Sequence, residues 1–177
     1  MQSPGPVTIA PGVTMDLPFT RVPGRAVDAV QRVTAHYQDR TVVFEGRISA
    51  TPERFLLVSL DTLGRRAMTV TWTAAGVHAE AAPWLPASVR AENMLADIVL
   101  IYWPEAAVRA ALTGASLEVT AGRRSVRSRS GGEVVRIDYG TGVSGPWSGL
   151  LHLHNLAWGY GLDIQSQETR ASEETRP

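Results

Sequence analysis

The sequence predicts a mainly β protein in which one strongly curved antiparallel sheet of about ten or eleven strands forms an incomplete barrel, with a two-helix lid inserted mid-chain. Two observations predict this class. Segments rich in Val, Thr, Ile and aromatic residues recur at the spacing of roughly 8–12 residues that is typical of antiparallel meanders. Helical periodicity is confined to 86–114, so strands and helices do not alternate as they would in a doubly wound parallel sheet.

Five strands are expected before the helical region and five after it. In the second strand Val42, Phe44 and Ile48 share one parity and charged residues take the other, which predicts one buried and one solvated face. The expected strand boundaries are 26–37, 41–49, 54–60, 67–72 and 76–81, followed by 116–121, 123–130, 134–139, 149–155 and 159–165.

The segment 59–66 joins two strands and places Leu63 at the turn beside Gly64. A single exposed leucine is ordinary on a protein surface, so its position alone assigns no role. If Leu60 pairs with Arg65, one face of this hairpin is apolar, and a slip of one residue would invert that face. The members of the apolar face are Phe55, Leu57, Met68, Val70 and Trp72.

A wide apolar stripe predicts an amphipathic helix that begins after Ser88 as its N-cap. Pro104 opens a second short helix, and Gly114 is placed to end it. If this pair of helices lies across the concave face of the sheet, a cavity is expected between the helices and the sheet. Its expected lining is Phe44, Phe55, Leu57, Met68, Val70, Trp72, Met94, Leu95, Ile98, Ile101 and Tyr102.

The chain divides into a Pro-rich leader or tether at 1–25, a domain at 26–166 and a polar tail at 167–177. The most apolar run, 94–103, is about half of the ~20 residues that a membrane-spanning helix requires. The first residues have neither the charged region nor the apolar region of an export signal.

Composition and charge exclude several classes of function. All seventeen basic residues are arginine, they balance seventeen acidic residues, and the chain has neither lysine nor cysteine. Schiff-base lysines, a Walker-A lysine, thiol nucleophiles and thiolate zinc sites are therefore excluded. A neutral chain is also not expected to bind nucleic acid, because phosphate contacts usually require a basic excess.

No motif predicts a catalytic centre, a metal site or a cofactor. His152 and His154 share one face of a strand, but a zinc site needs a third ligand. Glu92 and Asp97 lie about 140° apart around the helix and do not face each other. The stretch around Ser144 lacks the second glycine and the strand–turn–helix context of a nucleophile elbow.

The densest charge in the chain is a run of arginines. Arg123, Arg127 and Arg129 share a parity and are expected to line one face of a hairpin. Such a face is either solvated in the usual way or contacts anionic lipid head groups or an acidic partner.

These elements together resemble the LolB-like outer-membrane lipoproteins over roughly 27–165. More closely, the chain resembles small uncharacterised lipoproteins that are often found beside fatty-acid- or aryl-polyene-type biosynthetic genes. The features that carry the resemblance are the Asp61-Thr-Leu63-Gly64 hairpin, Trp84-Leu85-Pro86, the helix with Glu92-Asn-Met-Leu95-Ala-Asp97, the helix at Trp103-Pro104 and the closing hairpins.

The resemblance implies a LolA/LolB-type carrier fold whose apolar cavity receives acyl chains, and a Leu63-Gly64 loop that inserts into the membrane. It implies a lipid anchor at the periplasmic face of the outer membrane, although the chain has no cysteine to acylate. Anchoring therefore requires an upstream cysteine, and without one a soluble periplasmic carrier is expected. The implied partners are a lipid or acylated lipoprotein, the inner leaflet and a periplasmic LolA-like carrier, with the protein acting as a monomer.

The favoured function is a non-catalytic carrier that delivers acyl chains to the outer membrane. Burial gains roughly 0.8 kcal/mol per CH₂, and a bilayer offers the same environment for release, so no nucleotide is required. One alternative is an enzyme that acts on a lipid-like substrate through His152 or His154 and a carboxylate. A second alternative is a scaffold protein that binds partners of a biosynthetic complex through its arginine face.

Overall fold

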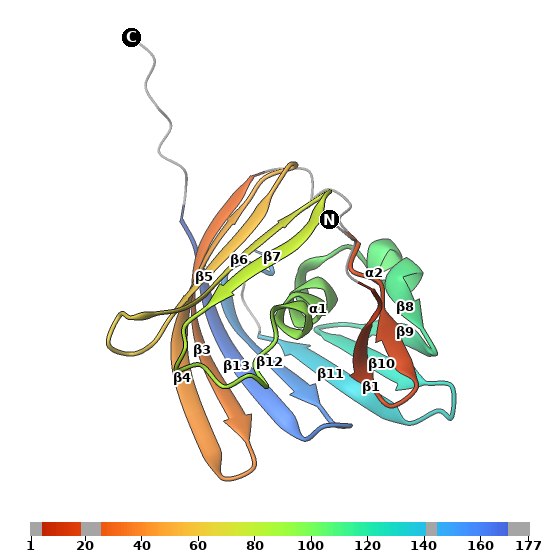
Figure 1. The fold of residues 1–177 in the computed structure, drawn as a ribbon. Helices are drawn as coiled ribbons and strands as arrows, with labels where there is room; N and C mark the ends of the chain where they lie inside the picture. The colour runs from red at the N-terminus through yellow and green to blue at the C-terminus, as the bar shows by residue number, and fades with distance from the viewer. Residues whose placement is uncertain (1–4, 19–25, 141–144, 170–177) are drawn as a thin grey trace.

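One ten-stranded antiparallel sheet forms most of the protein, and it curves strongly without closing into a barrel (Figure 1). The computed structural model describes residues 5–18, 26–140 and 145–169. The strand order is β7-β6-β5-β4-β3-β13-β12-β11-β10-β9, so the last strand of the chain joins the two halves of the sheet. The predicted fold class is confirmed.

The ten strands of this sheet lie close to the predicted ranges. They alternate inward apolar and outward polar residues, as a sheet with one buried face requires. Their bounds are β3 (Val27–Tyr37), β4 (Arg40–Ala50), β5 (Phe55–Leu60), β6 (Arg66–Thr73), β7 (Gly76–Ala81), β9 (Ala115–Thr120), β10 (Arg123–Ser128), β11 (Glu133–Tyr139), β12 (Gly149–Asn155) and β13 (Tyr160–Glu168).

Two helices interrupt the strands where helical periodicity predicts them. In α1 (Ala91–Tyr102) the N-cap is Arg90, without a side-chain cap, so the expectation that Ser88 caps this helix is wrong. In α2 (Glu105–Ala111) Pro104 is the N-cap, and the helix ends at Leu112. Figure 1 shows α1 inside the curve of the sheet, where its apolar residues face the inward side chains of the strands. None of the described helices is long and apolar enough to cross a bilayer.

A buried hairpin at the start of the chain was not predicted. β1 (Val7–Ala10) and β2 (Val13–Met15) pair with each other and with β8 (Leu112–Thr113) in a separate three-stranded sheet. Residues 7–15 are therefore part of the core, not of the tether expected at 1–25, because their alternating apolar side chains are buried. Of the expected polar tail, 167–168 belong to β13, and 170–177 lie outside the described residues.

Gly114 has a different role from the predicted helix stop. The chain leaves α2 directly as strand β8, and Gly114 follows it with a φ of +83°. A Cβ at this position would lie 2.1 Å from the carbonyl oxygen of Gly12. Glycine is thus required both by the left-handed backbone and by the close approach of the N-terminal hairpin.

The register of the β5–β6 hairpin is shifted from the predicted one. Phe55 pairs with Trp72 and Leu57 with Val70, and a bulge lies between Ser59 and Leu60. Because the shift amounts to two residues, the apolar face keeps its predicted members, all of which are buried.

Candidate functional site

The concave face of the sheet is covered by α1, and most of the predicted cavity residues lie in this interface. Their side chains pack together in one core, in which Trp103 stacks on Trp72 at 5.7 Å and meets Phe55 edge-on. The buried members of the predicted lining are Phe55, Leu57, Met68, Val70, Trp72, Leu95, Ile98, Ile101 and Tyr102, while Phe44 and Met94 are partly buried. In this arrangement the protein's own side chains fill the space beneath α1.

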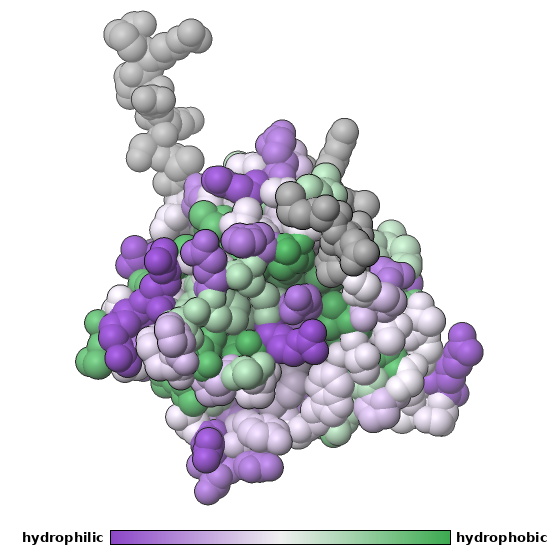
Figure 2. Space-filling view, in the orientation of Figure 1, coloured by the Kyte–Doolittle hydropathy of each residue, from purple (hydrophilic) through white to green (hydrophobic). Residues whose placement is uncertain are grey.

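The same apolar face continues beyond the edge of the core. Tyr160 contacts α1 and therefore points to the concave side, and the strand register places four further residues on that side. Together they form a surface that we call the open apolar strip, made up of Tyr37, Val42, Phe44, Tyr160 and Leu162. Val42 was expected to be buried, but it is 57% exposed because β3 and β4 extend past the end of α1. Figure 2 shows apolar surface in the middle of one face of the molecule, with polar residues around it.

A carboxylate of α1 lies at the edge of this strip. The Tyr160 hydroxyl donates to both oxygens of Asp97, each at 3.0 Å. Burial raises the pKa of Asp97 to about 7, although the Tyr160 hydrogen bond acts in the opposite direction. Asp97 was considered as half of a catalytic pair with Glu92; the structure pairs it with a tyrosine of β13 instead.

A second polar contact between α1 and the sheet is fully buried. Gln31 of β3 donates to the Tyr102 hydroxyl at 2.6 Å and to Ser166 Oγ of β13 at 3.0 Å. Burial raises the pKa of Tyr102 to about 12, so its hydroxyl stays protonated at neutral pH. These hydrogen bonds satisfy polar groups that would otherwise cost free energy in the apolar interior.

The C-terminus of α1 is held by two side chains from the far half of the sheet. Arg124 of β10 donates to the carbonyl oxygens of Leu100 and Trp103, both at 2.8 Å, and the Tyr139 hydroxyl donates to that of Ile101. The last turn of α1 has no basic residue of its own, so Arg124 supplies the cation that the negative end of the helix dipole favours.

We expect Arg124→Met, which keeps the apolar stem of the side chain, to lower the free energy of unfolding by about 2–3 kcal/mol, because two charge-assisted hydrogen bonds are lost. Its neighbour Arg123 pairs with Asp138 on the exposed face, so the matched Arg123→Met should cost less than about 1 kcal/mol. Urea unfolding measures both values. Equal losses in the two variants would show that Arg124 does not anchor α1.

The Leu63 side chain projects from the turn of the β5–β6 hairpin and is 78% exposed. Asp61 Oδ1 accepts hydrogen bonds from the backbone N–H groups of Leu63 and Arg65, and Oδ2 accepts one from Arg65 Nε at 2.7 Å. Slight desolvation raises the pKa of Asp61, but these hydrogen bonds outweigh it and the pKa is lowered. Gly64 has a φ of +76°, and the Arg65 guanidinium lies 4.8 Å above the exposed Trp84 ring. The hairpin thus presents one leucine on a turn that is hydrogen-bonded through Asp61.

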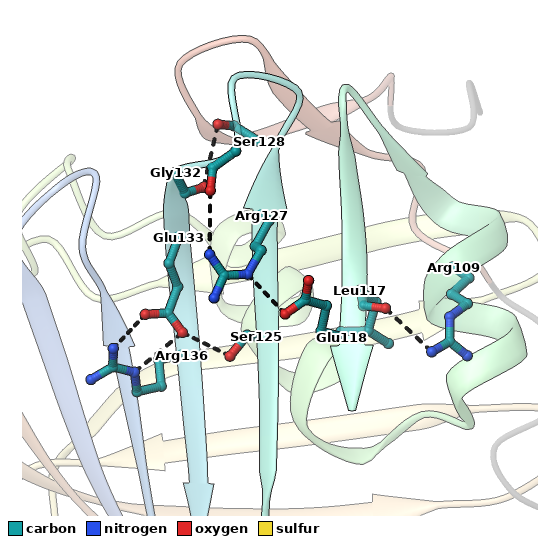
Figure 3. Close-up of polar contacts among 10 residues, drawn as sticks. Arg109, Leu117, Glu118, Ser125, Arg127, Ser128, Gly132, Glu133 and Arg136 are labelled. Carbon is teal, nitrogen blue, oxygen red and sulfur yellow. Dashed lines mark hydrogen bonds and ion pairs between the residues drawn. The ribbon is translucent and has the colours of Figure 1, made fainter. Parts of the chain in front are cut away.

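The arginine face is extensively ion-paired (Figure 3). Arg127 contacts Glu118 at 2.8 Å, Arg136 forms a short ion pair with Glu133, and Arg123 pairs with Asp138. The Arg136 hydrogen bond lowers the pKa of Glu133 below its usual range. Arg123 and Arg127 share the outward face of β10, as expected, because this strand pairs with β9 in unbroken register. Arg129 lies beyond β10 in the turn, and a bulge between Val126 and Arg127 interrupts only the pairing with β11. Contact of these arginines with head groups or a partner stays a prediction.

The histidines point away from the concave face. His152 and His154 alternate with the buried Leu151 and Leu153, as predicted, so they lie on the convex side. His152 Nδ1 is 2.5 Å from Asp163 Oδ1, and His36 Nε2 is 2.8 Å from Oδ2 of the same carboxylate. Within the described ranges, no group of three His, Asp or Glu side chains is arranged to hold a metal ion. The nucleophile candidate Ser144 lies outside the described residues.

An open groove of about 560 Å³ lies on the convex side, next to the Leu63 hairpin. Val30, Val43 and Arg47 line it from the outward positions of β3 and β4, and Leu60 and Asp61 line it from the hairpin. This groove is separated from α1 by the sheet itself.

Sequence reasoning missed four residues that connect α1 to the sheet: Gln31, Arg124, Tyr139 and Tyr160. Each is a lone polar residue on an inward position of a strand. That placement was the one feature of the sequence that could have indicated a polar contact with the helix. Gln31, Tyr139 and Tyr160 are each 38 or more residues from their partners on α1. Arg124 is 21–24 residues from the carbonyl groups that it contacts. Sequence spacing therefore could not identify these pairs.

The fold resembles that of a LolA superfamily protein. A LolA superfamily protein from Nitrosomonas europaea superposes with a TM-score of 0.50 at 11% identity, covering 86% of this chain and 89% of that one. A domain from Vibrio parahaemolyticus described as an outer membrane lipoprotein-sorting protein matches with a TM-score of 0.42 at 8% identity, over 85% and 88% of the two chains. A DUF1329 family protein from Desulfovibrio piger matches with the same TM-score at 9% identity, over 85% and 86%.

By sequence, the chain belongs to the DUF3261 family of proteins of unknown function, whose model matches residues 28–168. A search of curated proteins found no significant match.

Proposed function

We propose that this protein is a non-catalytic carrier that holds the acyl chains of a lipid or lipoprotein between α1 and the concave face of the sheet. The observation that carries the proposal is the continuity of the apolar surface. The buried face beneath α1 continues into the open apolar strip, where Val42 and Tyr37 are more than half exposed. An acyl chain can contact this strip before any part of the protein moves.

Full occupancy requires α1 to move, because in the present arrangement its residues fill the interior. The helix is held to the sheet by its apolar packing and by a small set of polar contacts, through Asp97, Tyr102 and its C-terminal carbonyl groups. An acyl chain that replaces helix side chains against the sheet recovers roughly 0.8 kcal/mol per buried CH₂, which offsets the loss of those contacts. The similarity in fold to a LolA superfamily protein supports the carrier proposal.

The proposal extends to delivery at the inner leaflet of the outer membrane, with Leu63 entering the bilayer. Leu63 and Trp84 are both exposed, and the Arg65 guanidinium of the same hairpin lies over the Trp84 ring. Attachment by an N-terminal lipid and receipt of cargo from a LolA-like carrier belong to this proposal as well.

A substrate-converting enzyme is less well supported. That hypothesis needed a histidine and a carboxylate together inside the cavity, and the histidines lie on outward strand positions or at the exposed edge of the sheet.

Adjacent valines of β4 test where the acyl chain binds. Val42 lies on the concave strip, and Val43 lines the convex groove. We expect Val42→Asp to weaken binding of a fluorescent fatty acid at least about tenfold, because an apolar contact is replaced by a charge. Val43→Asp should leave the dissociation constant within about twofold.

The opposite ranking of the two variants would place the acyl chain in the convex groove. No displaceable binding of the probe to the wild-type protein would refute the carrier proposal altogether.

A further inference from the structure

Asp97 is a partly buried carboxylate without a cation. Within the described ranges its hydrogen-bond partner is the Tyr160 hydroxyl, and no arginine forms an ion pair with it. Most other interior polar groups of the lid interface are matched by hydrogen bonds, as Gln31 and Tyr102 are. A buried acid that lacks a compensating charge is expensive, and such groups are concentrated at functional sites.

The position of Asp97 is suited to the head group of a bound amphiphile. Tyr160 lies directly opposite Tyr37, the last residue of β3, so the Asp97 carboxylate is close to the open end of the concave face. From this point the apolar side chains of α1 and the strands lead inward beneath the helix. A molecule whose chain follows that path leaves its polar end beside Asp97.

The surrounding groups favour a positive charge at this place. The carboxylate supplies a negative charge, and the rings of Tyr37 and Tyr160 supply aromatic faces that attract cations. Arg40, directly opposite Tyr37 at the start of β4, is the basic residue that the register of β3, β4 and β13 places on this face. It is exposed, and within the described residues no ion pair joins it to Asp97.

We propose that Asp97, with Tyr37 and Tyr160, binds the ammonium head group of an amphiphile whose chain lies beneath α1. The inference rests on the proposed carrier function and names the class of cargo: amphiphiles with an amino group are selected over neutral or acidic ones of the same chain length.

The test compares dodecylamine, dodecanol and dodecanoate as competitors of a fluorescent acyl probe, each below its micelle concentration. At pH 8 the wild-type protein should bind dodecylamine at least about tenfold more tightly than dodecanol, which is the usual strength of a charge-assisted hydrogen bond. Asp97→Asn should remove this preference by weakening the binding of dodecylamine. Glu92→Gln, on the first turn of the same helix, should keep it.

Two further measurements separate recognition from a structural role. The preference for the amine should decrease at pH 5.5, where Asp97 is protonated and the amine is still charged. Tyr160→Phe retains the ring and should retain most of the preference. An equal ratio of amine to alcohol affinity in the wild-type and Asp97→Asn proteins would refute this inference while leaving the carrier proposal intact. Failure of all three ligands to bind would refute both.

Discussion

Replacing Leu63 by aspartate is expected to abolish productive contact with a bilayer without unfolding the protein. The side chain is 78% exposed, and Asp61 accepts the hydrogen bonds that hold the turn beneath it. The substitution should therefore change the free energy of unfolding little. Burying a leucine is worth about 1.5–3 kcal/mol, and a charge opposes insertion further. The transfer rate of a fluorescent acyl cargo to phospholipid vesicles should therefore fall at least about tenfold, with the affinity for the cargo unchanged.

The matched control is Leu150→Asp. Leu150 is also an exposed leucine, 43% accessible, but it lies on β12 at an outward position, away from the Leu63 hairpin. Its substitution should leave transfer as fast as in the wild-type protein. Similar rates in all three proteins would show that the hairpin has no part in delivery.

Asp97→Asn is expected to make the protein more stable above neutral pH. The pKa of Asp97 rises from 3.8 to about 7 on folding, so between these values the folded state binds more protons than the unfolded state. The wild-type free energy of unfolding should therefore fall as pH rises from about 4 to 7 and level off above. The accumulated cost of the ionised, buried carboxylate is on the order of 4 kcal/mol.

Urea unfolding at pH 5 and pH 8 measures this effect as a difference between variants. The Asp97→Asn protein should lack most of the decline, because its amide stays neutral and still accepts a hydrogen bond from Tyr160. Glu92→Gln should reproduce the wild-type slope. If wild-type and Asp97→Asn proteins show parallel pH profiles, the carboxylate is not desolvated as described.

Periodicity alone predicted the sheet well. Alternation in β5 and β6 identified the buried face, including Phe55 and Trp72, even though the predicted register was shifted by two residues. The stripe of α1 was equally informative, because a helix with so many apolar residues must lie against an apolar surface.

Other features depend on contacts that the sequence does not display. The N-terminal hairpin was missed because its proline- and glycine-rich surroundings are typical of a tether. In the structure its second strand pairs with β8, about 100 residues away, and Val13 and Met15 are buried. Val42 has the parity of a core residue, but the strand extends beyond the helix that would cover it. Where an element ends relative to its neighbour is a tertiary property.

The candidate site was predictable in its apolar part and not in its polar part. The Leu63 turn follows from local sequence, since Asp61 and Gly64 have the residue types that such a turn requires. The pairing of Asp97 with Tyr160 joins residues 63 apart, and neither has a local motif.

The location of a bound acyl chain tests the central claim most directly. A fatty acid with a nitroxide label on its chain can be added to the methyl-labelled protein, and the nitroxide broadens NMR signals of methyl groups near it. The account predicts broadening at Leu57, Ile98 and Leu162 on the concave side, with Val43 and Leu60 in the convex groove unaffected. Broadening confined to Val43 and Leu60, or no broadening at any of the five, would contradict it.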